Sequence, residues 1–181
     1  MPPSLAELLH DWHDFYLLVG TASATLVGLM FVATSIGASI FDEDHSAGMT
    51  AFITPTVVHF AAVLFTCLMV TIPTQNWYTL GGLIGAGGLA GGVYCGQLVV
   101  QMIVRHRFNV DVTDRLFYSL LPLLGYLLAL VAAALLLMQS PASANVVAAA
   151  VLTLLFAAIR NAWDMMVWIV LKAPSGAAPP S

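Results

Sequence analysis

Five long apolar stretches constrain the fold of this chain more than any other feature of its sequence. A helix needs about 20 mostly apolar residues to cross the roughly 30 Å hydrocarbon core of a membrane. The stretches that meet this need are Phe15–Ile40, Ala51–Ile72, Tyr78–Val104, Phe117–Met138 and Asn145–Leu171. The connections between them are short, so consecutive helices should pack as antiparallel neighbours. The sequence therefore predicts an all-α fold, a polytopic transmembrane helical bundle of five spans with short loops.

The composition of the chain excludes several other classes of protein. Of its 181 residues, 60% are apolar and 8% are charged, whereas a soluble domain is about 45–50% apolar and about 25% charged. Two Cys and only five Lys and Arg residues argue against a disulfide scaffold and against a nucleic-acid binder. An integral membrane protein remains, with the lipid bilayer as its first partner.

Both ends of the chain are expected to lie outside the membrane. Residues 1–14 predict a short amphipathic helix on the surface, because Ser4 and Glu7 form an S-x-x-E capping box. This segment lacks the basic region of a cleaved signal peptide, so none is expected. Residues 173–181 are rich in Ala, Pro and Ser, which predicts a disordered tail.

The distribution of Lys and Arg predicts the orientation of the bundle. Arg105, Arg107 and Arg115 lie between the third and fourth stretches, and Lys172 follows the fifth. In a five-span protein these segments lie on one side, and flanking cations favour the cytoplasm. The expected arrangement has the N-terminus outside and the C-terminus in the cytoplasm, in a bacterial inner membrane.

Small residues recur every four positions in two of the stretches. They are Gly20, Ala24 and Gly28 in the first stretch, and Gly88, Gly92 and Gly96 in the third. This spacing lets helix backbones approach closely, which favours helix packing. The alternative is a flexible or pore-facing helix. The spacing leaves open whether the faces meet within one chain or between copies.

Ionisable residues inside the apolar stretches form a second candidate site. His59, Arg160 and Asp164 all fall in the half of the membrane nearer the predicted cytoplasmic side, at about 1.5 Å of rise per residue. Asn161 lies at a similar depth, as does Thr56. Charged residues within spans are costly and often functional. The sequence therefore predicts an intramembrane polar cluster of His59, Arg160, Asn161 and Asp164.

Three interpretations of this cluster remain open. It could be a structural network, in which Arg160 pairs with Asp164 and His59 bonds across to the fifth stretch. It could line a path for ions or protons, with His59 titrating near neutral pH. Alternatively, Arg160 could extend towards the cytoplasmic headgroups of the bilayer.

No catalytic, metal or cofactor site is expected. The His and carboxylate residues at 10–14 and 42–45 lack the ligand spacing of known metal sites. The G-x-G-x-x-A pattern at residues 85–90 lies within an apolar stretch, without the preceding strand that a nucleotide site requires. No nucleophile has a base at a suitable spacing, so the chain is not expected to be an enzyme.

Two segments of the chain resemble a family of small, uncharacterised bacterial multi-pass membrane proteins. The first is WHDFY at residues 12–16 followed by VGTASATLVGLMFVATSIGASI, and the second is RNAWD at residues 160–164. The resemblance implies a multi-pass membrane protein and brings no activity or site residues with it.

Two functions are consistent with these features. The first is a non-enzymatic integral membrane protein that acts as a self-associating or accessory subunit, with copies of itself or another membrane protein as its partner. The alternative is an oligomeric ion channel or proton-linked carrier that uses the His59, Arg160 and Asp164 cluster.

Overall fold

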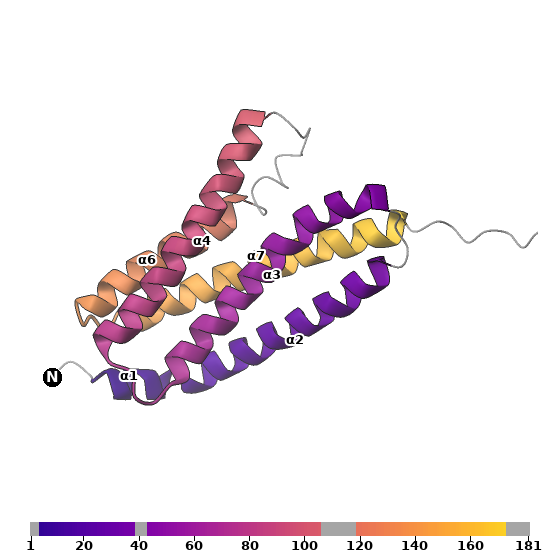
Figure 1. Ribbon diagram of the computed structural model, residues 1–181. Helices are drawn as coiled ribbons and strands as arrows, with labels where there is room; N and C mark the ends of the chain where they lie inside the picture. The colour runs from indigo at the N-terminus through magenta and orange to yellow at the C-terminus, as the bar shows by residue number, and fades with distance from the viewer. Residues whose placement is uncertain (1–3, 39–42, 106–118, 173–181) are drawn as a thin grey trace, which may run out of the picture.

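The computed structural model describes residues 4–38, 43–105 and 119–172 of the chain (Figure 1). Within these ranges the backbone forms six helices and no strand. They are α1 (Leu5–Asp11), α2 (His13–Ala38), α3 (Glu43–Thr71), α4 (Trp77–Arg105), α6 (Leu121–Leu137) and α7 (Ser143–Lys172). The all-helical class that the sequence predicted is therefore confirmed.

Four of the described helices are long and apolar enough to cross a membrane. The segments that meet this requirement are His13–Ile36, Thr54–Thr71, Trp77–Val100 and Ser143–Val167. Helix α6 is also apolar, but it has 17 described residues and is shorter than the other four. Residues 117 and 118 of the predicted fourth span lie outside the described residues.

Helix boundaries differ most from the prediction in α3. The sequence predicted a loop at residues 41–50 and a helix from Ala51, whereas the described helix begins at Glu43. Hydropathy marks where a chain enters lipid, but a helix satisfies its backbone hydrogen bonds internally and can continue beyond that point. Helices α2, α4 and α7 likewise begin one or two residues before the predicted spans. Most of the predicted loop at 105–116 and the tail at 173–181 lie outside the described residues.

The predicted helix near the N-terminus is α1, which is capped by its own side chains. The Ser4 backbone N–H donates to Glu7 Oε2 at 2.8 Å, and the Glu7 N–H donates to Ser4 Oγ at 3.3 Å. These reciprocal bonds satisfy backbone donors that a helix start leaves free. The helix ends at Asp11, Trp12 is its C-cap, and α2 begins at His13.

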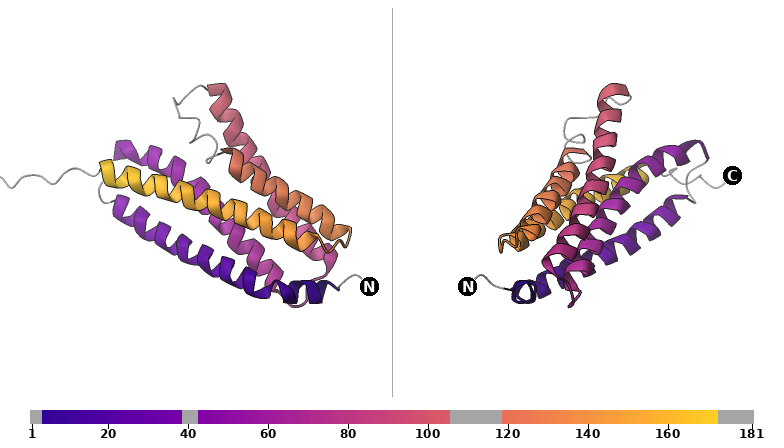
Figure 2. Two further views of the ribbon diagram at one scale, coloured as in Figure 1. Left: turned by 180° about the vertical axis from the view of Figure 1, so that it is seen from behind. Right: turned by 60° about the vertical axis from the view of Figure 1, so that its left-hand side comes forward.

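Helix α7 joins two helix pairs into one bundle. Helix α2 packs on α3, and α4 packs on α6, while α7 packs on both α3 and α6. All of these helices approach one another at the end of the bundle that carries α1 (the α1 end). Towards the opposite end, the α4–α6 pair diverges from α2, α3 and α7 (Figures 1 and 2).

The buried apolar side chains form two clusters. The larger cluster of buried apolar side chains draws on all six described helices. A smaller cluster consists of Met30, Phe60, Ala158 and Met165, which come from α2, α3 and α7. Since Phe60 and Ala158 share this cluster, the turn of α3 that carries His59 lies at the level of the turn of α7 that precedes Asn161.

The outside of the bundle is strongly apolar. Leu18 is 71% exposed and Met138 is 76% exposed, and many other large apolar side chains point outwards. A contiguous apolar exterior of this kind is unfavourable in water but suits the hydrocarbon of a membrane. The fold is that of a helical membrane bundle.

Candidate intramembrane polar site

The centre of the candidate site is a pair of buried side chains from α3 and α6. His59 has no exposed surface and Tyr126 is 2% exposed. The Nδ1 atom of His59 lies 3.0 Å from the Tyr126 hydroxyl. In the Nε2–H tautomer the phenol donates to Nδ1, and in the other tautomer the ring donates to the phenol oxygen. The second ring nitrogen, Nε2, is buried and has no hydrogen-bond partner among the described residues.

Two glycines allow close contacts beside the tyrosine, one with its ring and one between α6 and α7. A Cβ atom on Gly91 of α4 would lie 2.0 Å from Cε1 of Tyr126, so no other residue fits there while the ring keeps its position. A Cβ atom on Gly125 would lie 2.7 Å from Leu154, so α6 and α7 also come into close contact beside the ring. Backbone approach of this kind is the usual role of glycine between membrane helices. The Tyr126 ring therefore packs directly on α4, while the backbone of α6 beside it packs closely on α7.

Two further buried polar residues lie close to the turn of α3 that carries His59, one on α3 itself and one on α7. Thr56 of α3 lies one turn before Phe60, and Asn161 of α7 lies one turn after Ala158; both polar residues are fully buried. Buried polar groups in a membrane bundle are normally satisfied by other protein groups. Each of the two residues takes part in at least one non-covalent interaction in the structure.

Arg160 and Asp164 form the ion pair that their i, i+4 spacing predicted. Their side chains are 37% and 25% exposed, so the pair lies on a side of α7 that partly faces the outside of the bundle. The second carboxylate oxygen of Asp164 is buried and has no hydrogen-bond partner among the described residues. The structure thus joins Arg160 to Asp164, as the structural interpretation expected. That interpretation also expected His59 to bond to the fifth stretch, α7, and the structure shows its bond to α6 instead.

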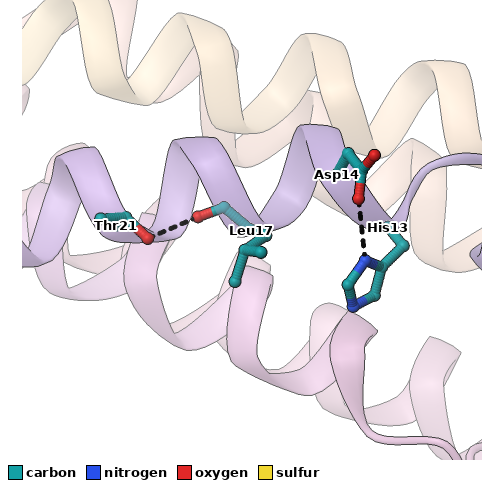
Figure 3. Close-up of polar contacts among 4 residues, drawn as sticks. All are labelled: His13, Asp14, Leu17 and Thr21. Atoms are coloured by element: carbon teal, nitrogen blue, oxygen red, sulfur yellow. Dashed lines mark hydrogen bonds and ion pairs between the residues drawn. The ribbon is translucent and has the colours of Figure 1, made fainter.

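The hydroxyl groups of α2 point mainly away from this site. Thr21 donates to the Leu17 carbonyl at 2.8 Å (Figure 3), and Thr25 and Ser35 make equivalent bonds one turn back along their own helix. All three are exposed. A hydroxyl bonded to its own backbone can face lipid at little cost.

Only some of the predicted packing residues pack within the chain. A Cβ atom on Gly20 would lie 3.1 Å from Cβ of Cys67, and one on Gly88 would lie 3.1 Å from Leu130, so these glycines allow α2–α3 and α4–α6 contacts. Gly92 lies farther from its neighbour, with Tyr126 Cβ at 3.9 Å from the added atom. The remaining three are Ala24, which is exposed, and Gly28 and Gly96, beside which no described atom comes within 4 Å of an added Cβ.

The polar residues at the α1 end are surface groups. His13 Nδ1 lies 3.1 Å from Asp14 Oδ1, and both side chains are largely exposed (Figure 3). Across the described ranges, no three His, Cys, Asp or Glu side chains come together in a way that could hold a metal ion. In the group at residues 42–45, residue 42 and the side chains of residues 43–45 lie outside the described part of the structure.

Sequence reasoning missed Tyr126, the partner of His59. A signal was present, because Tyr126 is the only polar residue in the apolar sequence LPLLGYLLALVAAALLL. A phenol at that depth needs a partner from another helix. Helical spacing alone does not identify which helix supplies it.

The fold and this site together define a membrane-embedded helical protein with a buried polar contact between its helices. Comparison with known proteins finds no match to a family model, to a curated protein or to a solved structure. The resemblance of residues 12–40 and 160–164 to bacterial membrane proteins accordingly stays a prediction.

Proposed function

We propose that the protein is a non-enzymatic membrane subunit of five spans that associates with copies of itself. The observation that carries this proposal is the set of small residues left uncovered on the outside of the bundle. On α2, Ala24 is exposed and Gly28 has open space beside it; on α4, Gly82 and Gly87 have open space as well. Glycines at similar spacing inside the chain are covered by another helix. A second protein would cover the outer ones in the same way.

The finer features of this proposal come from the sequence. Helix α6 would provide the fifth crossing together with the residues before it. The Lys and Arg distribution supports an inner-membrane protein with its N-terminus outside and its C-terminus in the cytoplasm. An accessory role beside another membrane protein would use the same outer faces.

The test is the oligomeric state of the full chain in lipid bilayers, measured by single-molecule photobleaching at several protein-to-lipid ratios. Gly28→Leu and Gly87→Leu place a large side chain on the uncovered faces, and at least one should weaken association about tenfold, equivalent to about 1.4 kcal/mol. Leu18→Val is the control, because this exposed side chain lies off the small-residue positions. A monomeric wild type, or unchanged association in both glycine variants, would contradict self-association.

The second candidate is an oligomeric channel or proton-linked carrier. The buried Nε2 of His59 favours it, because this atom has no hydrogen-bond partner among the described residues and could bind a proton or a polar solute. Ion and proton flux should be measured in liposomes containing wild type, His59→Ala or Asp164→Asn. Flux that both variants alter, in particles of wild-type size, would support a channel. Absence of flux in a well-assembled wild type would leave the polar cluster with a structural role.

A further inference from the structure

The hydrogen bond between His59 and Tyr126 spans a boundary within the bundle. Helix α3 packs mainly on α2 and α7, whereas α6 packs mainly on α4 and α7. The His59–Tyr126 contact therefore joins two helices that make few other contacts with each other. Towards the end opposite α1, the α4–α6 pair diverges from α2, α3 and α7 (Figures 1 and 2).

The α4–α6 pair has the contacts of a unit that moves together. Along α4, Gly81, Gly85, Gly88 and Gly91 each lie against α6, and an added Cβ at any of them would come within 3.3 Å of an α6 atom. Contacts this close, repeated over ten residues, leave little room for α4 to shift on α6. Movement of the pair relative to the α2–α3 pair would meet less resistance. The two pairs contact each other directly mainly through α3 and α4, which touch much less extensively than α4 and α6, and otherwise through α7, whose contact with α3 is less extensive than its contact with α6.

We propose that His59 and Tyr126 form a latch that sets the angle between the α4–α6 pair and the α2–α3 pair. With the hydrogen bond in place, the α4–α6 pair and the α2–α3 pair keep one distance from each other at the end of the bundle opposite α1. Without it a second, wider separation becomes populated. This inference concerns motion within one chain, so it stands or falls independently of self-association.

The imidazole also has the chemistry that a reversible latch needs. Only Nδ1 is engaged, and Nε2 has no partner among the described residues. The bond to Tyr126 can therefore break without disrupting a larger hydrogen-bonded network around His59. Gly91 of α4 lies directly against the tyrosine ring, so the closed position is well defined.

Distances between spin labels in the full-length protein in bilayers test the latch. One label is attached at Val100→Cys on α4 and the other at Val32→Cys on α2, both exposed positions towards the opposite end. The buried Cys67 and Cys95 are replaced by alanine in all samples. A control label pair at Leu89→Cys and Leu127→Cys, also exposed, lies within the α4–α6 pair.

Three variants separate the latch from a general loss of packing. Tyr126→Phe keeps the ring and removes the hydroxyl, and His59→Leu removes the imidazole. Each should raise the ratio of wide to narrow separations about threefold, the effect of one average hydrogen bond between membrane helices. His59→Asn places an amide near the position of Nδ1 and should keep the wild-type distances. The control pair should stay unchanged in every variant.

Two results would overturn the proposal. One is a wild-type distance distribution in both Tyr126→Phe and His59→Leu, which would mean that the bond does not set the angle. The other is a shift of the control pair together with the test pair, which would mean that these substitutions loosen the whole bundle.

Discussion

The hydroxyl of Ser23 on α2 donates a hydrogen bond to the backbone carbonyl of Phe60 on α3, at 2.7 Å, in a fully buried position. The accepting carbonyl belongs to the residue next to His59. The bond therefore fixes α2 against the turn of α3 that carries the candidate site. It is also the kind of side-chain bond between helices that can stabilise a membrane bundle.

Ser23→Ala should lower the free energy of unfolding by about 0.6 kcal/mol, and by no more than about 1.7 kcal/mol, the range for hydrogen bonds between membrane helices. Ser35→Ala is the matched control, because the Ser35 hydroxyl bonds to its own helix and faces outwards. Unfolding by denaturant in mixed micelles measures both. Equal losses in the two variants would show that the contact with Phe60 adds nothing.

Gly91→Ala should destabilise the protein by about 1–3 kcal/mol, because the added methyl group overlaps the ring of Tyr126. Gly87→Ala adds the same group four residues earlier, where no described atom lies within 4 Å of it. Because alanine is the better helix former, this variant should keep the wild-type stability or raise it by up to about 1 kcal/mol. Thermal unfolding in detergent compares the two variants. Similar melting temperatures would contradict the close contact between α4 and Tyr126.

Tyr16→Phe should cost about 0.5–1.5 kcal/mol of stability. The Tyr16 hydroxyl is buried and donates to the Ala144 carbonyl at 3.2 Å, so it joins the start of α2 to the start of α7. Tyr78→Phe serves as the control, since Tyr78 is 62% exposed. Chemical unfolding with both variants in parallel would reveal the difference, and a larger loss for Tyr78→Phe would be the opposite of this expectation.

The carboxyl group of Glu7 should titrate below the ordinary pKa of a glutamate. The Ser4 backbone N–H, and secondarily the Ser4 hydroxyl, stabilise its charged form and lower its pKa. Because the folded pKa is lowered, the capping contribution to α1 is present above the ordinary pKa and is lost as the pH falls through the lowered value. Carbon chemical shifts of Glu7 against pH measure this pKa. Ser4→Ala removes the hydroxyl and keeps the backbone N–H, so it should raise this pKa only part of the way towards the ordinary value, and an identical midpoint in that variant would exclude the hydroxyl as a cause.

Hydropathy predicted the helices well because long apolar runs have few other stable arrangements. It could not predict where α3 begins, since residues 43–50 are polar enough for a loop and are nevertheless helical. The capping box of α1 was predicted from Ser4 and Glu7, and the structure shows both of its hydrogen bonds. Local patterns of this kind depend on neighbouring residues only.

The candidate site was harder to predict because it depends on which helix faces which. The i, i+4 spacing of Arg160 and Asp164 was enough to predict their ion pair. The partner of His59 lies 67 residues away on α6, and depth in the membrane places many residues at the same level. The glycine pattern had the same weakness, because Gly20 and Gly28 share one spacing while only Gly20 lies against another described helix.

The central place of α7 has a consequence for the order in which the bundle can be built. Among the described helices α7 is synthesised last, yet it contacts both α3 and α6 and supplies the carbonyl that accepts the bond from Tyr16. Before α7 enters the membrane, the α2–α3 and α4–α6 pairs can form, but the helix that holds them together is missing. Without α7 the two pairs meet mainly through the limited contact between α3 and α4 and the bond between His59 and Tyr126, so we expect the bundle to reach its full packing only when α7 has joined it.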